Sequence, residues 1–147
     1  MSPYFIVDNG MIDMLKTKAQ SGVDVRLIIP GIPDKKIVYT LTRANAEKLV
    51  SYGVRLYLFT PGFLHSKVML SDNECAVVGS INMDFRSFYQ QYESAAYIGC
   101  GETLQAIADD FQNTFGMSKE IHPEDTKNHN IFTRIWLTFL RLFAPLM

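Results

Sequence analysis

The sequence is poor in cysteine and carries almost no net charge. Only two of its 147 residues are cysteines, Cys75 and Cys100, and their spacing matches no metal-binding pattern. A disulfide framework is therefore disfavoured, and a reducing compartment fits better. The formal net charge of −1 provides no global attraction for nucleic acid. We therefore expect any anion to be bound locally, and we do not expect nucleic acid as a partner.

Membrane-crossing segments are also missing. Asp8 interrupts the early apolar run, which argues against a signal peptide. No stretch reaches the ~18 uncharged apolar residues that a membrane span requires. Hydrophobic residues nevertheless make up 48% of the sequence, enough for one compact domain with a real core. A strand that starts at Tyr4, almost at the first residue, favours a cut through a longer protein.

The hydrophobic periodicity predicts an α/β fold. Strand, helix, strand, helix and strand follow one another in the first part of the chain, which implies parallel pairing with covering helices. A hairpin and a further strand follow, so we expect a mixed, largely parallel sheet flanked by helices. The predicted strands cover 4–7, 23–29, 54–59, 65–71, 75–79 and 91–98, and the predicted helices lie between 12 and 22, 34 and 53, and 104 and 115.

The tail differs from the rest of the chain. We expect one domain over 1–126 and a C-terminal amphipathic helix within 127–147. Arg134, Thr138 and Arg141 form the only polar stripe of this helix. Either it docks onto the domain core, or it lies in a membrane interface, for which its tryptophan and two arginines are suited. Its apolar residues are Ile131, Phe132, Ile135, Trp136, Phe139, Leu140 and Phe143.

A histidine and a lysine stand out in an otherwise apolar run. His65 and Lys67 are two residues apart, so in a strand their side chains share one face. Ser80 and Asn82 follow about one strand and one turn later. We expect the imidazole, the ammonium, the hydroxyl and the carboxamide to lie within reach of one another. Such a group of donors suits a phosphate.

These residues belong to a longer pattern of fixed identities and gaps: His65, Lys67, Asp72, Gly79, Ser80 and Asn82. The pattern resembles the HKD motif of the phospholipase D superfamily, and it is complete. The resemblance covers nearly the whole chain and corresponds to the C-terminal half of a bacterial cardiolipin synthase-like protein. The other segments that carry it are 3–6, 22–26, 33–36, 62–65, 84–88 and 141–146.

The resemblance implies a role for each motif residue. The histidine of such a motif attacks phosphorus and forms a phosphohistidine, so that role falls to His65. Covalent catalysis of this kind divides one difficult displacement into two easier ones. Glu93 would hold the other ring N–H of the imidazole. Lys67 and Asn82 would bind the non-bridging phosphate oxygens, and Ser80 would add a hydrogen bond.

Other positions receive weaker or no assignments. Asp72 belongs to the motif, but its place at the end of a strand suggests a structural role. Lys36 and Arg86 could contact anionic head groups. His122 and His129 lack a lysine two residues later, so neither begins a second motif. The resemblance implies neither a metal nor a cofactor, and the sequence has no tight carboxylate cluster for Mg²⁺.

The implied reaction is cardiolipin synthesis from two phosphatidylglycerol molecules by a phosphatidyltransferase at the bacterial cell membrane, presumed on its cytoplasmic side. The family site is built from two such motifs, and this chain has one. The second HKD half would come from a homodimer or from a missing N-terminal region. Two alternatives remain open: a homodimeric one-motif phosphodiesterase that is a phospholipase or a nuclease, and a catalytically silent fragment that binds a membrane or a partner through its last helix.

Overall fold

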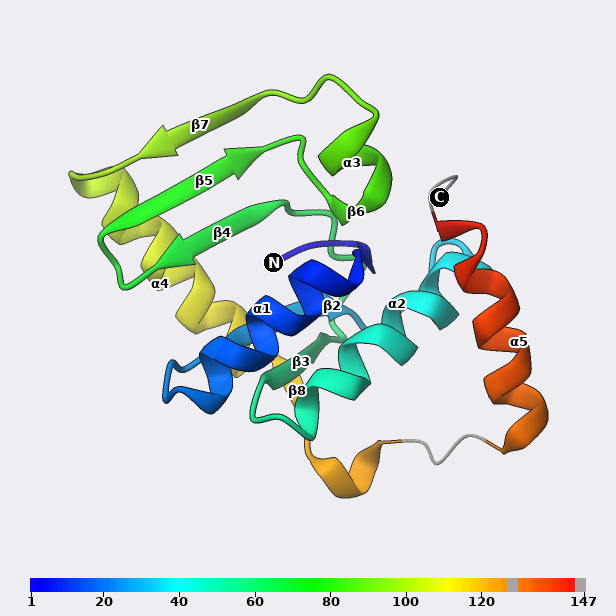
Figure 1. Cartoon of the computed structure of the whole chain (residues 1–147). Helices are drawn as coiled ribbons and strands as arrows, with labels where there is room; N and C mark the ends of the chain where they lie inside the picture. The colour runs from blue at the N-terminus through cyan, green and yellow to red at the C-terminus, as the bar shows by residue number, and fades with distance from the viewer. Residues whose placement is uncertain (127–129, 145–147) are drawn as a thin grey trace.

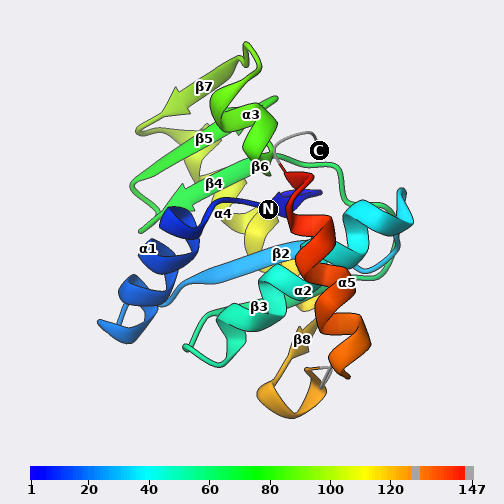
Figure 2. The same cartoon turned by 45° about the vertical axis from the view of Figure 1, so that its right-hand side comes forward.

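The protein has a mixed α/β architecture in which helices flank hydrogen-bonded strands (Figure 1, Figure 2). The computed structural model describes residues 1–126 and 130–144. The elements in chain order are β1 (Phe5–Ile6), α1 (Asn9–Gln20), β2 (Arg26–Pro30), α2 (Lys36–Val50), β3 (Arg55–Phe59), β4 (Val68–Ser71), β5 (Cys75–Gly79), β6 (Met83–Asp84), α3 (Phe85–Tyr89), β7 (Ala95–Ile98), α4 (Glu102–Gly116), β8 (Ser118–Ile121), the 3₁₀ turn η1 (Pro123–Asp125) and α5 (Ile131–Arg141).

The strands of the described ranges form three ladders, ordered β2-β3-β8, β4-β5-β7 and β1-β6. The N-terminal segment joins the first two. Met1 and Val68 exchange main-chain hydrogen bonds of 2.7 and 3.0 Å, and the amide of Ser2 donates to the Ile28 carbonyl at 3.1 Å. Ser2 also accepts from the Met83 amide through its hydroxyl, at 3.0 Å. Residues 1–6 therefore connect all three ladders at the centre of the molecule.

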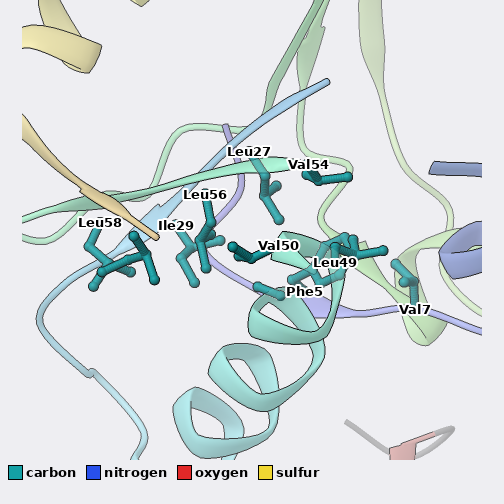
Figure 3. Packing of buried hydrophobic residues seen from close by; sticks show 11 residues of the cluster. Phe5, Val7, Leu27, Ile29, Leu49, Val50, Val54, Leu56 and Leu58 are labelled. Carbon is teal, nitrogen blue, oxygen red and sulfur yellow. The ribbon is translucent and has the colours of Figure 1, made fainter. Parts of the chain in front are cut away.

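The core lies on both faces of β2 and β3, because their side chains alternate. Leu27 and Ile29 face one cluster, which Figure 3 shows packed against α2. Ile28, between them, faces a second cluster that includes Phe111 of α4. Burial on both faces explains why β2 reads as an almost continuous apolar run, as buried parallel strands do.

Local signals in the sequence define the helix ends. The Asp8 carboxylate caps α1 by accepting from the Met11 amide at 2.8 Å. Gly22 and Gly53 follow α1 and α2 with φ of +92° and +95°, a left-handed conformation that glycine adopts without steric cost. The expected helix ends at these glycines are confirmed. No helix in the described ranges combines the length and the apolarity needed to cross a membrane.

The predicted fold class is confirmed, but the strand details differ from the prediction. Two strand pairings are parallel, β1–β6 and β2–β3, and three are antiparallel, so the parallel share is smaller than expected. One reason is β8, which the sequence did not reveal. Ile121 ends this strand and is buried against the core. The short elements β6 and α3 were also not predicted.

Two predicted strands that contain candidate site residues begin later than expected. The first starts at Val68, where the main chain of Met1 becomes available as a partner, so His65 and Lys67 precede the strand. The last starts at Ala95 rather than Gln91, because the chain before it turns around Ser80. His65, Lys67 and Glu93 thus lie on segments that lead into strands, not within them.

Candidate functional site

A short extended segment before β4 positions His65 and Lys67. Leu64 is buried in the second core cluster and anchors this segment. The neighbouring His65 is exposed, and its ring lies on Phe63 with the centroids 5.5 Å apart. The Lys67 ammonium donates to the carbonyl of His65 at 2.8 Å. Anchoring on one side and exposure on the other present the imidazole to solvent beside a cation.

Two carboxylates influence the charge of Lys67. Burial lowers the pKa of its ammonium from the ordinary value, and the negative charges of Glu93 and Asp84 act in the opposite direction. Asp84 is itself buried and caps α3 by accepting from the Ser87 amide at 2.7 Å. Lys67 is therefore partly desolvated but faces fixed negative charge, which holds a cation in place without pairing it fully.

The end of β5 explains why the motif has a glycine before its serine. A Cβ on Gly79 would lie 2.2 Å from the Ser94 carbonyl oxygen and 2.6 Å from the Cα of Ala95. The missing side chain lets β5 approach β7 closely enough for the main chains of Ser80 and Ser94 to pair at 2.9 Å. The Ser80 hydroxyl then reaches the Glu93 carboxylate. Glycine at this position thus positions the serine.

A hydrogen-bonded network continues from Glu93 to Asn82. The Ser80 hydroxyl, and after it that of Ser87, lower the pKa of Glu93, and the charge of Lys67 adds to this. The Ser87 hydroxyl also accepts from the Asn82 amide nitrogens, at 3.2 Å from the main chain and 3.4 Å from the side chain. The Asn82 carboxamide oxygen is buried and has no hydrogen-bond partner in the described ranges. Such an orphaned polar atom is costly and is typical of functional sites.

Four of the predicted residues, Lys67, Ser80, Asn82 and Glu93, are thus brought into one network beside the fifth, His65. Within the described part of the chain the His65 imidazole has no hydrogen-bond partner. The Glu93 carboxylate accepts a hydrogen bond from the Ser80 hydroxyl instead of from that ring. The assignment of Glu93 to the imidazole N–H remains a prediction.

Asp84 and Ser87 belong to this network, and sequence reasoning gave neither of them a role. The sequence did contain a signal for Asp84, because aspartate is a preferred N-cap residue and can accept a hydrogen bond from the amide three residues later, here that of Ser87.

Asp72 lies apart from this network. It forms the hairpin turn with Asn73, and both residues have positive φ, 54° and 57°. The Glu74 amide donates to the Ser71 carbonyl at 2.9 Å, so Asp72 and Asn73 are the central residues of a tight turn whose positive φ values Asp and Asn tolerate. Five residues of extended chain separate Asp72 from Lys67, a span of about 16 Å. The structure therefore assigns Asp72 to the turn at the far end of the hairpin.

A cavity of about 310 Å³ adjoins the network on the side of Asn82 and Asp84. Lys35 and Arg86 supply its cationic lining, whereas Lys36, predicted for this role, is exposed at the start of α2 and does not line it. Lys35 precedes α2 in extended conformation, which turns it in a different direction from its neighbour.

A second contact ties Arg86 to the network. With its amide turned so that donors meet acceptors, Gln91 donates to Glu93 and accepts from Arg86, both at 3.1 Å. Arg86, predicted as a substrate contact, is thus linked to Glu93 through one side chain.

Among the residues that the structure describes, the remaining histidine and the acidic residues form no second centre. His122 caps the 3₁₀ turn η1, and His129 lies outside the described residues. In residues 1–126 and 130–144, no three His, Cys, Asp or Glu side chains gather in a way that could hold a metal ion.

Solved structures with the same fold include a phospholipase D family member and a phosphatidylserine synthase. Nuc from Salmonella typhimurium, a phospholipase D family member, superposes with a TM-score of 0.70 and 18% identity, over 83% of this chain and 80% of that one. Phosphatidylserine synthase from Haemophilus influenzae Rd KW20 gives a TM-score of 0.71 and 18% identity, over 99% of this chain and 38% of that one. At this level of identity the likeness concerns the fold.

Sequence comparison gives a closer relationship. Residues 1–115 match the family described as cardiolipin synthase, phospholipase D-like domain. Cardiolipin synthase of Halalkalibacterium halodurans is 38% identical over 146 residues, 99% of this chain and 29% of that protein. Cardiolipin synthase 1 of Staphylococcus aureus (strain COL) is also 38% identical, over 99% of this chain and 30% of that protein. The chain thus spans less than a third of these relatives, and it belongs to the family of cardiolipin synthase phospholipase D-like domains.

Proposed function

We propose that this chain is one catalytic half of a phosphatidyltransferase that makes cardiolipin from two phosphatidylglycerol molecules. One observation carries the proposal. A cation, Lys67, lies beside the exposed His65 and faces the hydrogen-bonded network of Ser80, Asn82 and Glu93. Lys67 supplies positive charge for a phosphodiester, and His65 supplies a nucleophile. The network fixes the positions of the surrounding hydrogen-bond donors. The family membership supports the choice of a phospholipid as the substrate.

The proposed reaction has two displacements at phosphorus. In the first, an imidazole nitrogen of His65 attacks the phosphodiester of one phosphatidylglycerol, an N–P bond forms, and the P–O bond to the head-group glycerol breaks. The leaving oxygen takes a proton and departs as glycerol. In the second, a hydroxyl of another phosphatidylglycerol gives up its proton and attacks phosphorus, and the N–P bond breaks. His65 is restored, and cardiolipin is the product.

The neighbouring groups act on the charge that develops at phosphorus. Lys67 provides a charged hydrogen-bond donor for a non-bridging oxygen of the phosphodiester. Such a donor stabilises developing negative charge more strongly in a partly desolvated site than in water. Asn82 contributes its carboxamide N–H, which makes only a long contact with Ser87. Glu93 acts through Ser80 and Lys67 and is in this sense a positioning residue.

The head group of the lipid has an adjoining place. The cavity of about 310 Å³ beside Asn82 has Lys35 and Arg86 in its lining. We assign it the glycerol head group of the donor or acceptor lipid, with the two cations near anionic oxygens.

The proton transfers need a second acid–base group facing His65. The chain has one motif, so a second HKD half comes in trans, from another copy or from a further region of a longer protein. We place the working enzyme at the bacterial cell membrane, on its cytoplasmic side, where its substrates are. Its anionic lipid substrates suit the local cations of a chain whose net charge is only −1.

A chimera provides the test. The matching 146-residue segment of Staphylococcus aureus cardiolipin synthase 1 is replaced by this chain, and cardiolipin formation from phosphatidylglycerol is measured. The wild-type chimera should make cardiolipin and carry an acid-labile, base-stable phosphoryl label, and His65→Asn should lose both. His122→Asn is the matched control, because His122 is exposed and acts only as a cap, which Asn can replace. Turnover in the His65→Asn chimera would disprove the proposal.

The chain alone distinguishes the sources of the second half. Turnover that rises with the square of the chain concentration, together with a dimer in sedimentation, would indicate two copies and favour the homodimeric phosphodiesterase. A monomer that is inactive alone but active in the chimera would indicate a further region of a longer protein.

A further inference from the structure

The cavity of about 310 Å³ beside Asn82 brings together segments that are far apart in the sequence. Lys35 reaches it from the residue before α2, Asp84 from the end of β6, and Arg86 from α3. Asn82 lines the cavity and also belongs to the hydrogen-bonded network around Glu93. The cavity therefore shares one wall with the candidate site, and a molecule bound in it would lie next to the reacting phosphate.

The two cations of the lining have no ion-pair partner. Neither Lys35 nor Arg86 has a carboxylate oxygen within 4.0 Å in residues 1–126 and 130–144. The Arg86 guanidinium donates to the Gln91 side chain at 3.1 Å, but this partner carries no charge. The positive charge of both side chains is therefore available to an anion in the cavity.

The carboxylates near the cavity are engaged by other groups. Asp84 is buried and accepts from the Ser87 amide at 2.7 Å. Asp34 accepts from the Tyr4 hydroxyl at 2.7 Å and from the amide of the next residue at 2.6 Å. Both carboxylates are thus fixed by neutral donors, and neither removes a cation from the lining.

The Asn82 carboxamide sets a second requirement for the ligand. Its oxygen is buried and has no hydrogen-bond donor in the described part of the chain. A phosphate does not satisfy this oxygen, because ionised oxygens only accept hydrogen bonds. A hydroxyl does, and the same carboxamide keeps its N–H for a phosphate oxygen. The cavity therefore matches a ligand that carries an anionic group and a hydroxyl close to it.

The two lipids of the proposed reaction differ in these groups. The glycerol that leaves the donor lipid is neutral once its bond to phosphorus has broken, so it would leave both cations of the cavity without a partner. The acceptor lipid keeps its own phosphodiester, which is separated from the attacking hydroxyl by one glycerol unit. Only the acceptor brings the anion and the hydroxyl together.

We propose that this cavity is the acceptor subsite: Lys35 and Arg86 bind the phosphodiester of the acceptor lipid, and the Asn82 carboxamide oxygen accepts from the hydroxyl that attacks phosphorus. The proposal rests on the proposed function and adds to it the residues that select the acceptor. The two cations then favour transfer to a lipid over hydrolysis, because water has no anionic group for them to bind.

Two water-soluble acceptors test the subsite in the chimera with Staphylococcus aureus cardiolipin synthase 1. One is labelled glycerol, and the other is labelled glycerophosphoglycerol, which is phosphatidylglycerol without its acyl chains. In both transfers a hydroxyl gives up its proton and attacks phosphorus, and the N–P bond to His65 breaks. The acceptors therefore share the donor step and differ in the phosphodiester. We expect kcat/KM for glycerophosphoglycerol to exceed that for glycerol about tenfold, because hydrogen bonds to charged groups are the stronger ones.

Substitutions of the cations should reduce this preference. Lys35→Gln and Arg86→Gln should each lower the ratio of the two kcat/KM values about fivefold, and Arg86→Lys should recover part of the loss. Lys36→Gln is the matched control, because Lys36 is exposed and adjacent in sequence but does not line the cavity. An equal change of the ratio in Lys36→Gln and Lys35→Gln would show a general charge effect and would overturn the subsite.

Two further results test the individual roles. An unchanged ratio in Arg86→Gln, with both transfers slower, would show that Arg86 acts on Glu93 through Gln91 and would overturn its place in the subsite. Asn82→Ala should slow both transfers to the same extent, because the hydroxyl is common to the two acceptors. A changed ratio in Asn82→Ala would contradict the contact between its carboxamide oxygen and the hydroxyl.

The acid-labile phosphoryl label separates this proposal from the proposed function. A wild-type chimera that carries the label and transfers to both acceptors without preference would overturn the acceptor subsite and leave the proposed function intact. A wild-type chimera that shows neither the label nor any transfer would overturn the proposed function and the subsite together.

Discussion

The two ends of the β4–β5 hairpin carry parts of one sequence motif in different physical settings. At the end nearest the candidate site, Lys67 precedes β4, and Gly79 ends β5 against the main chain of β7. At the other end, Asp72 and Asn73 form a tight turn with positive φ. The first end holds charges and donors in a network, whereas the second reverses the chain. Fixed residue identities within one motif can therefore satisfy chemistry at one end and backbone geometry at the other.

Replacing the cation should have the largest effect at the site end. Lys67→Gln removes the charged donor while keeping a side chain of similar length, and we expect turnover of the chimera to fall about 10²–10³-fold. The free energy of unfolding should change little, because the ammonium is only partly buried and contacts one carbonyl. Steady-state assays and urea denaturation of the same preparations provide both values. A loss of less than about tenfold would mean that Lys67 does not face the reacting phosphate.

Glu93→Gln should have the next largest effect, about 10²-fold on turnover, because Lys67 and Ser80 lose a fixed partner and small misplacements are costly. Glu93→Asp, which keeps the charge on a shorter side chain, should recover part of the loss. A structural role alone would predict equal losses for the two variants.

The same substitution makes a prediction about pH. Hydrogen bonds from Ser80 and Ser87 hold the folded-state pKa of Glu93 below its ordinary value of 4.5. The carboxylate therefore favours the folded state above pH 4.5, and this contribution is lost as the pH falls through the folded-state pKa. The stability of Glu93→Gln should decline less steeply than that of the wild type below pH 4.5. Urea denaturation at a series of acidic pH values measures this, and parallel curves would contradict it.

Much of the fold and of the site could be predicted from local signals. Glycines gave the ends of α1 and α2, and an almost continuous apolar run gave the buried strand β2. The motif spacing gave Lys67 and Ser80 as neighbours in space. These features depend on residues close in sequence, so the pattern alone contains the information.

Other features depend on distant partners. Strand β8 reads as polar because it contains Lys119 and Glu120; the half-buried Glu120 accepts a hydrogen bond from Arg55 of β3 at 2.9 Å. The position of Glu93 on Ser80 follows from the register of β5 and β7, which a single sequence does not specify. Lys35, and not Lys36, lines the cavity because Lys35 precedes helix α2 in extended conformation, whereas Lys36 is the first residue of the helix.

A smaller effect is expected where β5 approaches β7. Gly79→Ala forces a Cβ against the Ser94 carbonyl, so the two strands must separate, and we expect a loss of about 1–3 kcal/mol in unfolding free energy. Turnover should also fall, because Ser80 moves away from Glu93. Gly116→Ala is the matched control: a Cβ there meets nothing within 4 Å, and alanine in a helix should stabilise by about 0.5–1 kcal/mol. Equal destabilisation of both variants would contradict the role of the close approach.

The smallest effects belong to the turn. Asp72→Asn should change the unfolding free energy by less than about 0.5 kcal/mol, because Asn tolerates the left-handed conformation as well as Asp does. Asp72→Ala should cost about 1 kcal/mol, since alanine adopts positive φ less readily. Both variants should keep turnover within about threefold of the wild type, because about 16 Å of extended chain separates the turn from Lys67. A large loss of turnover in a stably folded Asp72→Asn would show that the two ends of the hairpin are coupled.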